Sequence, residues 1–379
     1  MDRINVGRHH HGHPWIFSNE ITNKKDTLPP AGIVDIYQGR RFLGRGFYNP
    51  HSLIAVRRFS NEAQEFDRQF VATMIMRALE YRTSFAGSKS YRLVYSESDG
   101  LPGLIIDRYD ADYVMQINCL GMDERRDLVV ESLMDLNPHS IYEKSDSSMR
   151  ALEGLQTRKG LLRGQLKNPV QIELDGLTFL VDIENGQKTG FFLDLTDTRR
   201  AAGGLSRNRK VLDLFCYTGA FACYALRGGA SEVTGVDSSE TAIALARENC
   251  RLNGMDHAVF VREDVFDFLR NDRSTYDLII LDPPSFTRSK KMLHAALRGY
   301  KEINIQAMKR LNRDGLLVTT SCSHHVSEHD FRDVLINAAS DAGVAMTVVH
   351  RTTQALDHPI LLSMPESLYL KCFFLKRVR

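Results

Sequence analysis

The C-terminal half of this 379-residue chain alternates short apolar runs with longer amphipathic segments. One such segment, 240–253, has helical spacing and ends at the stop signal Asn253-Gly254. Alternation of strands and helices favours an α/β fold with a doubly wound, mostly parallel sheet. The apolar runs that we expect to form its strands are 211–215, 232–236, 259–262, 278–281 and 316–320.

The residues before this sheet divide into two further predicted domains. Residues 1–65 hold short strands separated by Gly and Pro turns, which indicates a small all-β barrel. Residues 66–185 mix helical spacing with strand candidates, which indicates a small α/β domain. We therefore predict three domains, 1–65, 66–185 and 186–379. The predicted strands are 33–37, 42–48 and 54–59 in the barrel and 91–95, 104–109, 113–118 and 140–144 after it, with helices at 66–79 and 123–135.

The composition is that of an ordinary soluble globular protein, with 43% hydrophobic and 25% charged residues. No apolar run approaches the roughly 20 residues that a membrane-spanning helix needs. The first residues lack the basic and then apolar pattern of a signal peptide, so we expect a cytoplasmic protein without membrane contact. The net charge of +2 makes the chain as a whole no polycation, and any basic surface must be local.

Cysteine and histidine usage gives little support for a metal site. The six cysteines are scattered and form no CxxC pair, which argues against a disulfide framework and against zinc. A histidine cluster near the start has no second ligand set, and a solvated or RNA-facing loop explains it better. We therefore predict no metal. The cluster consists of His9, His10, His11 and His13.

The first loop after the strand at 211–215 has features of a ligand-binding turn. In an open α/β sheet, ligands bind beyond the carboxyl ends of the strands. Gly219 removes a side chain where backbone must approach a ligand, and the helix that follows offers free N–H groups to a carboxylate. The fingerprint GxGxxG is absent, which disfavours a dinucleotide; an ordinary tight turn explains the loop equally well. The candidate binding residues are Asp213, Phe215, Cys216, Tyr217, Thr218 and Gly219.

Two more strand ends carry acidic residues in the same order. Asp237 can hydrogen-bond two ribose hydroxyls, with Ser238 beside it; a helix N-cap made by Ser238 or Ser239 is the alternative. Asp264 can accept a hydrogen bond from an adenine amino group, although an N-cap explains it as well. The three strand ends together resemble class I methyltransferases. This resemblance implies S-adenosylmethionine as cofactor, whose positive sulfonium suits a site lined by carboxylates.

The fourth strand leads into Asp282-Pro283-Pro284-Ser285-Phe286. Two prolines fix φ and stiffen the loop where a substrate would bind. The Asp-Pro-Pro triplet resembles the motif of base-modifying methyltransferases. Enzymes that methylate exocyclic amines usually place an aromatic directly after the second proline, and Ser285 interrupts that pattern here. The candidate substrate residues are Pro283, Pro284 and Phe286, together with Arg288, Lys290 and Lys291, which can hold phosphates or form a solvated surface.

Cys322 follows the fifth strand, and we expect it to face Asp282. A thiolate that adds to carbon 6 of a pyrimidine turns carbon 5 into a nucleophile that can take a methyl group. Asp282 can hydrogen-bond the base edge and also lies beside the expected cofactor. The thiol needs nearby cationic or hydrogen-bond-donating groups to ionise. The alternative for Cys322 is a small buried hydrophobe, the usual state of a free cysteine.

At this point the sequence resembles the RlmI-type 23S ribosomal RNA cytosine-5 methyltransferases over nearly its whole length. The resemblance implies an N-terminal PUA barrel, a central α/β domain of EEHEE type and a C-terminal Rossmann-like methyltransferase domain. It implies that Cys322 is the nucleophile. It also implies that 188–199 packs over the donor through Phe191, Asp194 and Arg199, with domain-linker packing as the alternative. The matching segments are 13–17, 97–104, 186–194, 282–286, 321–325 and 358–359.

The resemblance therefore predicts methylation of a cytosine in 23S ribosomal RNA. Because the base must leave its stack to reach the cleft, we expect naked or partly assembled RNA as substrate. Two alternatives remain: methylation of a purine nitrogen with Cys322 structural, and an RNA-binding module without catalysis. The sequence leaves a homodimer open.

Overall fold

The computed structural model describes residues 2–7, 12–23, 28–85, 87–287 and 290–378, with Lys290 described by its backbone alone. The chain forms two compact units, and each is assembled from separate stretches of sequence. The chain passes between them in the region of β11 (Val170–Leu174) and β12 (Leu177–Val181). Unit 1 comprises Met1–Asp175, Val181–Leu193 and Leu356–Ser367, and unit 2 comprises Gly176–Leu180, Asp194–Ala355 and Leu368–Arg379.

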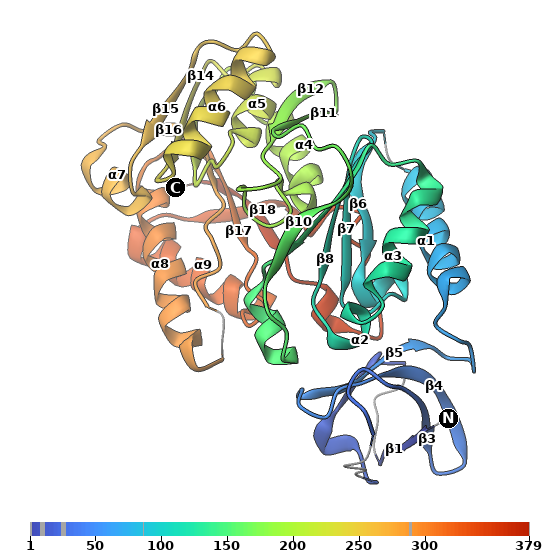
Figure 1. The fold of residues 1–379 in the computed structure, drawn as a ribbon. Helices are drawn as coiled ribbons and strands as arrows, with labels where there is room; N and C mark the ends of the chain where they lie inside the picture. The colour runs from blue at the N-terminus through green and yellow to red at the C-terminus, as the bar shows by residue number, and fades with distance from the viewer. Residues whose placement is uncertain (1, 8–11, 24–27, 86, 288–289, 379) are drawn as a thin grey trace. The chain divides into compact units, whose positions relative to one another are not determined.

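Unit 1 begins with a small five-stranded barrel sheet in the order β1-β3-β4-β5-β2 (Figure 1). Its first strand pairs parallel with β3, and the other pairs are antiparallel. Ile4, Val34 and Val56 are buried in its core. Gly44 is required where β4 meets β5, because a Cβ there would lie 2.0 Å from the Ser60 carbonyl oxygen. The strands are β1 (Asp2–Asn5), β2 (Trp15–Phe17), β3 (Ile33–Gln38), β4 (Arg41–Tyr48) and β5 (Ile54–Ser60).

Unit 1 continues as a second five-stranded sheet in the order β10-β9-β8-β7-β6, covered by two helices that contact each other. Figure 1 shows α1 and α3 on the same face of this sheet. Asp67 caps α1 by accepting a hydrogen bond from the Phe70 amide at 2.8 Å. The elements are α1 (Arg68–Thr83), β6 (Ser90–Tyr95), β7 (Leu104–Tyr109), β8 (Asp112–Ile117), α2 (Leu120–Asp123), α3 (Arg126–Leu133), β9 (Ser140–Ser145) and β10 (Arg158–Gly164).

Buried ion pairs connect the barrel to this second sheet within unit 1. Arg57 of β5 donates to Glu97 at 2.8 Å and to Glu153 at 3.1 Å, and all three side chains are nearly inaccessible. The Trp15 indole N–H also donates to Glu97, at 2.7 Å. Because a buried carboxylate left without partners is costly, this network fixes the barrel on the sheet. The predicted domain boundaries at 65 and 185 stay a prediction.

Unit 2 is a seven-stranded sheet in the order β15-β14-β13-β16-β17-β19-β18. The strands from β15 to β17 run parallel, and β19 is antiparallel to both of its neighbours. The strand order reverses between β13 and β16, where open sheets of this kind bind ligands. The doubly wound α/β sheet expected from the sequence is confirmed. Its strands are β13 (Lys210–Leu214), β14 (Glu232–Asp237), β15 (Ala258–Arg262), β16 (Tyr276–Leu281), β17 (Leu311–Ser321), β18 (Met346–Thr352) and β19 (Lys371–Arg377).

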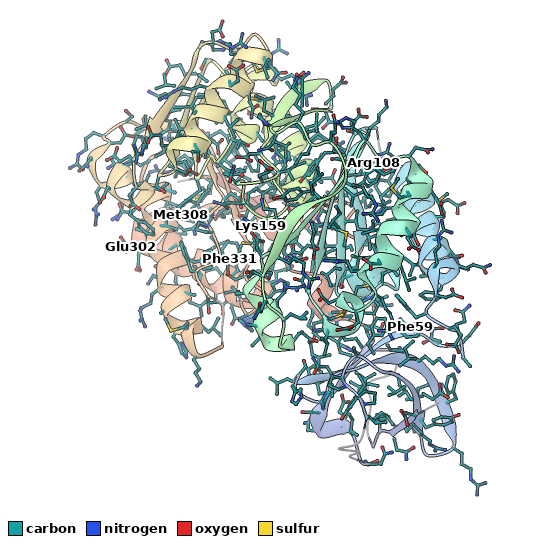
Figure 2. The ribbon with its side chains drawn as sticks, in the orientation of Figure 1. Phe59, Arg108, Lys159, Glu302, Met308 and Phe331 are labelled. Atoms are coloured by element: carbon teal, nitrogen blue, oxygen red, sulfur yellow. The ribbon has the colours of Figure 1, made fainter. Side chains whose placement is uncertain are left out.

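The helices of unit 2 pack as neighbours on the sheet, with α4 against α5 and α8 against α9. Met308 and Phe331, labelled in Figure 2, belong to the apolar core that α7, α8 and α9 form with the strands, whereas Glu302 of α8 is exposed. None of the described helices is long and apolar enough to cross a lipid bilayer. The helices are α4 (Thr196–Gly204), α5 (Ala220–Arg227), α6 (Glu240–Leu252), α7 (Val265–Asn271), α8 (Leu293–Lys309) and α9 (Glu328–Ala342).

Candidate functional site

The loop between β13 and α5 has an unusual backbone. Phe215 and Tyr217 have positive φ angles of 60° and 48°, a conformation that costs free energy for residues other than glycine. Gly219 has φ 73°, and a Cβ there would lie 2.9 Å from the Cβ of Ala246. The Asn249 side chain, buried in α6, holds the loop by donating to the Thr218 carbonyl at 2.9 Å. The loop at the switch point is therefore held in a conformation that a plain turn would not need.

Two buried polar atoms lie at this loop. Asp213 at the end of β13 is fully buried, and its Oδ2 accepts a hydrogen bond from the Ala222 amide at 3.1 Å. Its Oδ1 and the hydroxyl of Thr218 have no hydrogen-bond partner within the described part of the chain. Burial raises the pKa of Asp213 well above its usual value, and the charge of Asp282 adds to the effect. Unsatisfied buried atoms of this kind are uncommon in native structures.

The acidic residues after β14 and β15 differ in their surroundings. Asp237 accepts the Tyr217 amide at 3.0 Å and the Ser239 amide at 2.9 Å, so its carboxylate lies against the β13–α5 loop. Ser239, not Ser238, caps α6, and Ser238 is exposed. Asp264 is exposed and caps α7. Asp264 therefore serves as the N-cap of α7, and its contact with adenine stays a prediction.

Arg199 of α4 interacts electrostatically with three acidic residues of unit 2. Its guanidinium is buried and lies over the Phe221 ring, 5.5 Å from the ring centre. Burial lowers the pKa of Arg199, and its electrostatic interactions with Tyr224, Asp194, Asp282 and Asp213 oppose that shift. These four predicted residues therefore interact electrostatically within unit 2.

Phe191, also predicted to bind the cofactor, lies in unit 1 and has its own anchors there. Its amide donates to the Tyr109 hydroxyl at 3.1 Å. The same hydroxyl contacts that of Thr189 at 3.2 Å, and Thr189 donates to the buried Asp107 carboxylate. A buried network thus fixes this segment, and the role predicted for Phe191 stays a prediction. No local pattern in the sequence points to Tyr109 and Asp107 as its supports.

Asp282 and Cys322 follow neighbouring parallel strands. Leu281 of β16 lies opposite Thr319 of β17, which brings Asp282 level with Thr320. The Thr320 hydroxyl donates a hydrogen bond to the Asp282 carboxylate. Cys322 lies two residues farther along and is half-buried, whereas the other five cysteines, all of them described, are buried. The structure thus places both residues at the carboxyl edge of the sheet.

Hydrogen bonds fix the residue after Cys322 from three sides. The Ser323 hydroxyl contacts the Ser285 hydroxyl at 2.8 Å and the Tyr300 hydroxyl at 2.9 Å. Lys371 of β19 donates from Nζ to the Ser323 carbonyl at 2.8 Å. None of these roles was predictable from the sequence, because α8 and β19 approach the cysteine only through the fold. Ser285, which interrupts the motif expected of amine-methylating enzymes, therefore has a physical role. Its side chain links the Asp-Pro-Pro loop to the cysteine loop.

The remaining predicted substrate residues surround the same loop. Pro283 is buried and Pro284 exposed. Phe286 packs on the Tyr300 ring with 4.6 Å between ring centres, so contact of Phe286 with a base stays a prediction. Lys291 is exposed on a 3-10 turn, Lys290–Met292.

Some predicted residues lie outside the described residues: Arg288, the side chain of Lys290, and His9, His10 and His11. Their predicted contacts with phosphates or solvent stay predictions. His13 is buried and its Nε2 lies 3.1 Å from Glu366. Among the described residues, no group of three or more His, Cys, Asp or Glu side chains is placed to hold a metal ion.

Comparisons with known proteins bear on both units. A family model described as S-adenosylmethionine-dependent methyltransferase matches residues 158–359, and one described as a PUA-like domain matches residues 5–61. The chain is 43% identical over 372 residues to ribosomal RNA large subunit methyltransferase I of Aeromonas hydrophila, covering 95% of this chain and 94% of the relative. The Escherichia coli O139:H28 protein of the same name is 40% identical over 374 residues, with the same coverage.

A solved structure shares the whole fold. A methyltransferase crystallised in complex with SAH superposes with a TM-score of 0.86 at 24% identity, covering 99% of this chain and 100% of that one. A Streptococcus mutans protein described as a SAM-dependent methyltransferase superposes with a TM-score of 0.85 at the same identity and coverage. Both likenesses cover nearly the whole chain and so include both units. They agree with the predicted architecture, a PUA-like barrel followed by α/β domains.

Proposed function

The chain belongs to the S-adenosylmethionine-dependent methyltransferases, among the ribosomal RNA large subunit methyltransferase I proteins, and from this we propose that it methylates carbon 5 of a cytosine in 23S ribosomal RNA. The membership makes the chain a ribosomal RNA methyltransferase with S-adenosylmethionine as methyl donor. The proposal adds the position on the base and a covalent adduct with Cys322.

The residues at the switch point fit the donor. Asp213 and Thr218 offer buried oxygen atoms that lack hydrogen-bond partners within the described residues, at a loop whose backbone has positive φ angles. The carboxylates of Asp194 and Asp282 suit the positive sulfonium and amino groups, and the buried Arg199 suits the carboxylate. Asp237 lies where such sheets bind ribose hydroxyls. When bound, S-adenosylmethionine supplies an electrophilic methyl group.

In the proposed mechanism Cys322 is the nucleophile, and Asp282 binds the base and helps to remove its proton. The Cys322 thiolate forms a bond to carbon 6 of the cytosine, and the displaced electron pair makes carbon 5 nucleophilic. Carbon 5 takes the methyl group, and the sulfur–methyl bond of the donor breaks. Loss of the carbon 5 proton to Asp282, or to a water that it orients, expels the thiolate and restores the ring. Asp282 also holds the base edge, and Thr320 holds Asp282.

The observation that carries the proposal is the position of Cys322. It lies at the substrate edge of the sheet, partly exposed, one strand away from Asp282 and with its neighbour Ser323 fixed by Ser285, Tyr300 and Lys371. A cysteine that served only to fill the core would be buried like the other five.

Product analysis tests the proposed position on the base. Protein and labelled S-adenosylmethionine are incubated with large-subunit RNA from a strain that lacks this enzyme, and the nucleosides are separated by chromatography against standards of each methylated isomer. We expect 5-methylcytidine at one site. A methylated purine would replace the proposal with the nitrogen chemistry, and donor binding without transfer would favour an RNA-binding module.

A further inference from the structure

Lys371 is a buried lysine beside the cysteine loop that the mechanism above does not use. It begins β19 and lies opposite Ser321 in the antiparallel pairing with β17. Only 6% of its surface is exposed. Its Nζ donates to the Ser323 carbonyl at 2.8 Å. Lys371 thus contacts the chain on both sides of Cys322, at Ser321 by strand pairing and at Ser323 by its side chain.

We propose that Lys371 is the positioning residue of Cys322: its ammonium fixes the cysteine loop and supplies the positive charge that stabilises the thiolate. The inference rests on the proposed function, because the proposed covalent mechanism is what requires Cys322 to be a thiolate. An ammonium buried in protein acts more strongly on a nearby sulfur than one in water, since solvent screens it less. Thiols beside a lysine ionise more readily than free cysteine for this reason.

The electrostatics agree with the geometry. Burial lowers the pKa of Lys371 to about 8, and the negative charges of Cys322 and Glu328 oppose that shift. By reciprocity, the ammonium favours the Cys322 thiolate. Below pH 8 Lys371 is mainly charged and its effect on the thiol is fully present; as the pH rises through that value the charge and its effect are lost. The device therefore works at neutral pH.

The described groups near the cysteine loop include a tyrosine, a glutamate and two histidines. Tyr300 of α8 contacts the loop through Ser323, and burial raises its pKa to about 12, with the Cys322 charge contributing. It is therefore a neutral hydrogen-bonding group. Glu328 at the start of α9 is negative and pairs with Arg351. His324 and His325 follow on the same loop, and the His324 ring stacks on Tyr369 with 5.4 Å between ring centres.

Alkylation of the protein alone tests the inference. Because the other five cysteines are buried, iodoacetamide should label Cys322 first in the native protein, with Cys322→Ser as the blank and mass spectrometry to localise the label. The rate is followed from pH 6 to 10 for wild type, Lys371→Met, Lys371→Arg and Lys376→Met. Lys376 is the matched control: it lies on the same strand, but its ammonium is exposed and pairs with Asp314 at 3.1 Å.

In Lys371→Met we expect Cys322 to be alkylated about tenfold more slowly at pH 7 than in wild type, and the midpoint of its pH–rate curve to lie about one pH unit higher. At high pH the two alkylation rates should become equal. Lys371→Arg should restore most of the rate, and Lys376→Met should match wild type. Equal midpoints for wild type and a folded Lys371→Met would overturn the inference.

A second measurement covers the case in which Lys371→Met does not fold. The wild-type midpoint must then lie below the value of about 8.5 for a free cysteine, and a midpoint at or above it contradicts the inference. Neither readout uses RNA or methyl transfer. A shifted midpoint without 5-methylcytidine therefore removes the proposed function alone, and 5-methylcytidine without a shifted midpoint removes only the role of Lys371.

Discussion

The Thr320 hydroxyl donates a hydrogen bond to the Asp282 carboxylate, which links the ends of two parallel strands at the proposed substrate edge. Thr320 is fully buried and Asp282 is half-buried. The contact therefore sets the direction of a carboxylate that is still partly exposed. The account of catalysis depends on that orientation, and the sequence alone gave no reason to single out Thr320.

Replacing Thr320 by Val should slow methylation while leaving the fold intact. The change keeps the shape of the side chain and removes the hydroxyl. A hydrogen bond to a charged group contributes about 1.5–3 kcal/mol, so we expect kcat to fall about 10- to 100-fold. Steady-state kinetics measure the fall in kcat, and donor titration checks that the fold and its donor site stay intact. Thr320→Ser should recover most of kcat, and a wild-type kcat in Thr320→Val would show that Asp282 needs no such partner.

Replacing Gly219 by Ala should weaken donor binding and stability together. The new Cβ meets both a positive φ and Ala246 at 2.9 Å. Gly254 is the matched control, since it has φ +67° and no atom within 4 Å of the added Cβ. Gly254→Ala should lose only the conformational cost of about 1–2 kcal/mol. Gly219→Ala should lose more, measured by chemical denaturation, and should bind donor more weakly; equal losses would remove the argument from close packing.

Replacing Asp213 by Asn should change how stability depends on pH. Folding raises the pKa of Asp213, so the native state holds a proton that the unfolded chain releases. This residue therefore makes the free energy of unfolding fall as the pH rises above the ordinary value near 3.8. Asp213→Asn removes that fall. We expect its midpoint of thermal unfolding to drop less than that of wild type between pH 5 and 7.5.

Donor affinity and a surface variant complete the Asp213 experiment. Calorimetric titration should show weaker S-adenosylmethionine binding by Asp213→Asn, because an amide NH₂ group replaces the oxygen without a partner while the remaining oxygen accepts the Ala222 amide. Exposed Asp267, which pairs with Arg270, provides the control. Asp267→Asn should keep both the donor affinity and the wild-type pH dependence. Unchanged donor affinity in Asp213→Asn would place the donor elsewhere.

The sheet of unit 2 was largely predictable because its signal is local. Apolar runs of strand length predicted all five parallel strands, four of them within two residues of their observed bounds, while β17 begins five residues earlier than predicted. Two of these runs are followed directly by the acidic residues Asp237 and Asp282. The antiparallel pair β18 and β19 was not predicted. Nothing short-range in 371–377 reveals that this strand returns to lie beside β17.

The surroundings of the proposed nucleophile were not predictable for the same reason. Tyr300, Lys371 and Ser285 come from three separate segments and meet Ser323 only after the sheet forms. The positive φ angles of Phe215 and Tyr217 were also missed, because residues other than glycine rarely adopt them and the sequence carries no mark of the strain. Long-range register, rather than propensity, decides these features.

The most direct test of the central claim is capture of the covalent adduct. RNA that carries 5-fluorocytidine at the target site cannot lose the substituent at carbon 5, so Cys322 stays bound to carbon 6 after methyl transfer. With S-adenosylmethionine present, we predict a denaturation-resistant protein–RNA complex whose cross-linked peptide contains Cys322, and none with Cys322→Ala. Absence of any complex with an RNA that the enzyme does methylate, or a link through another residue, would contradict the account.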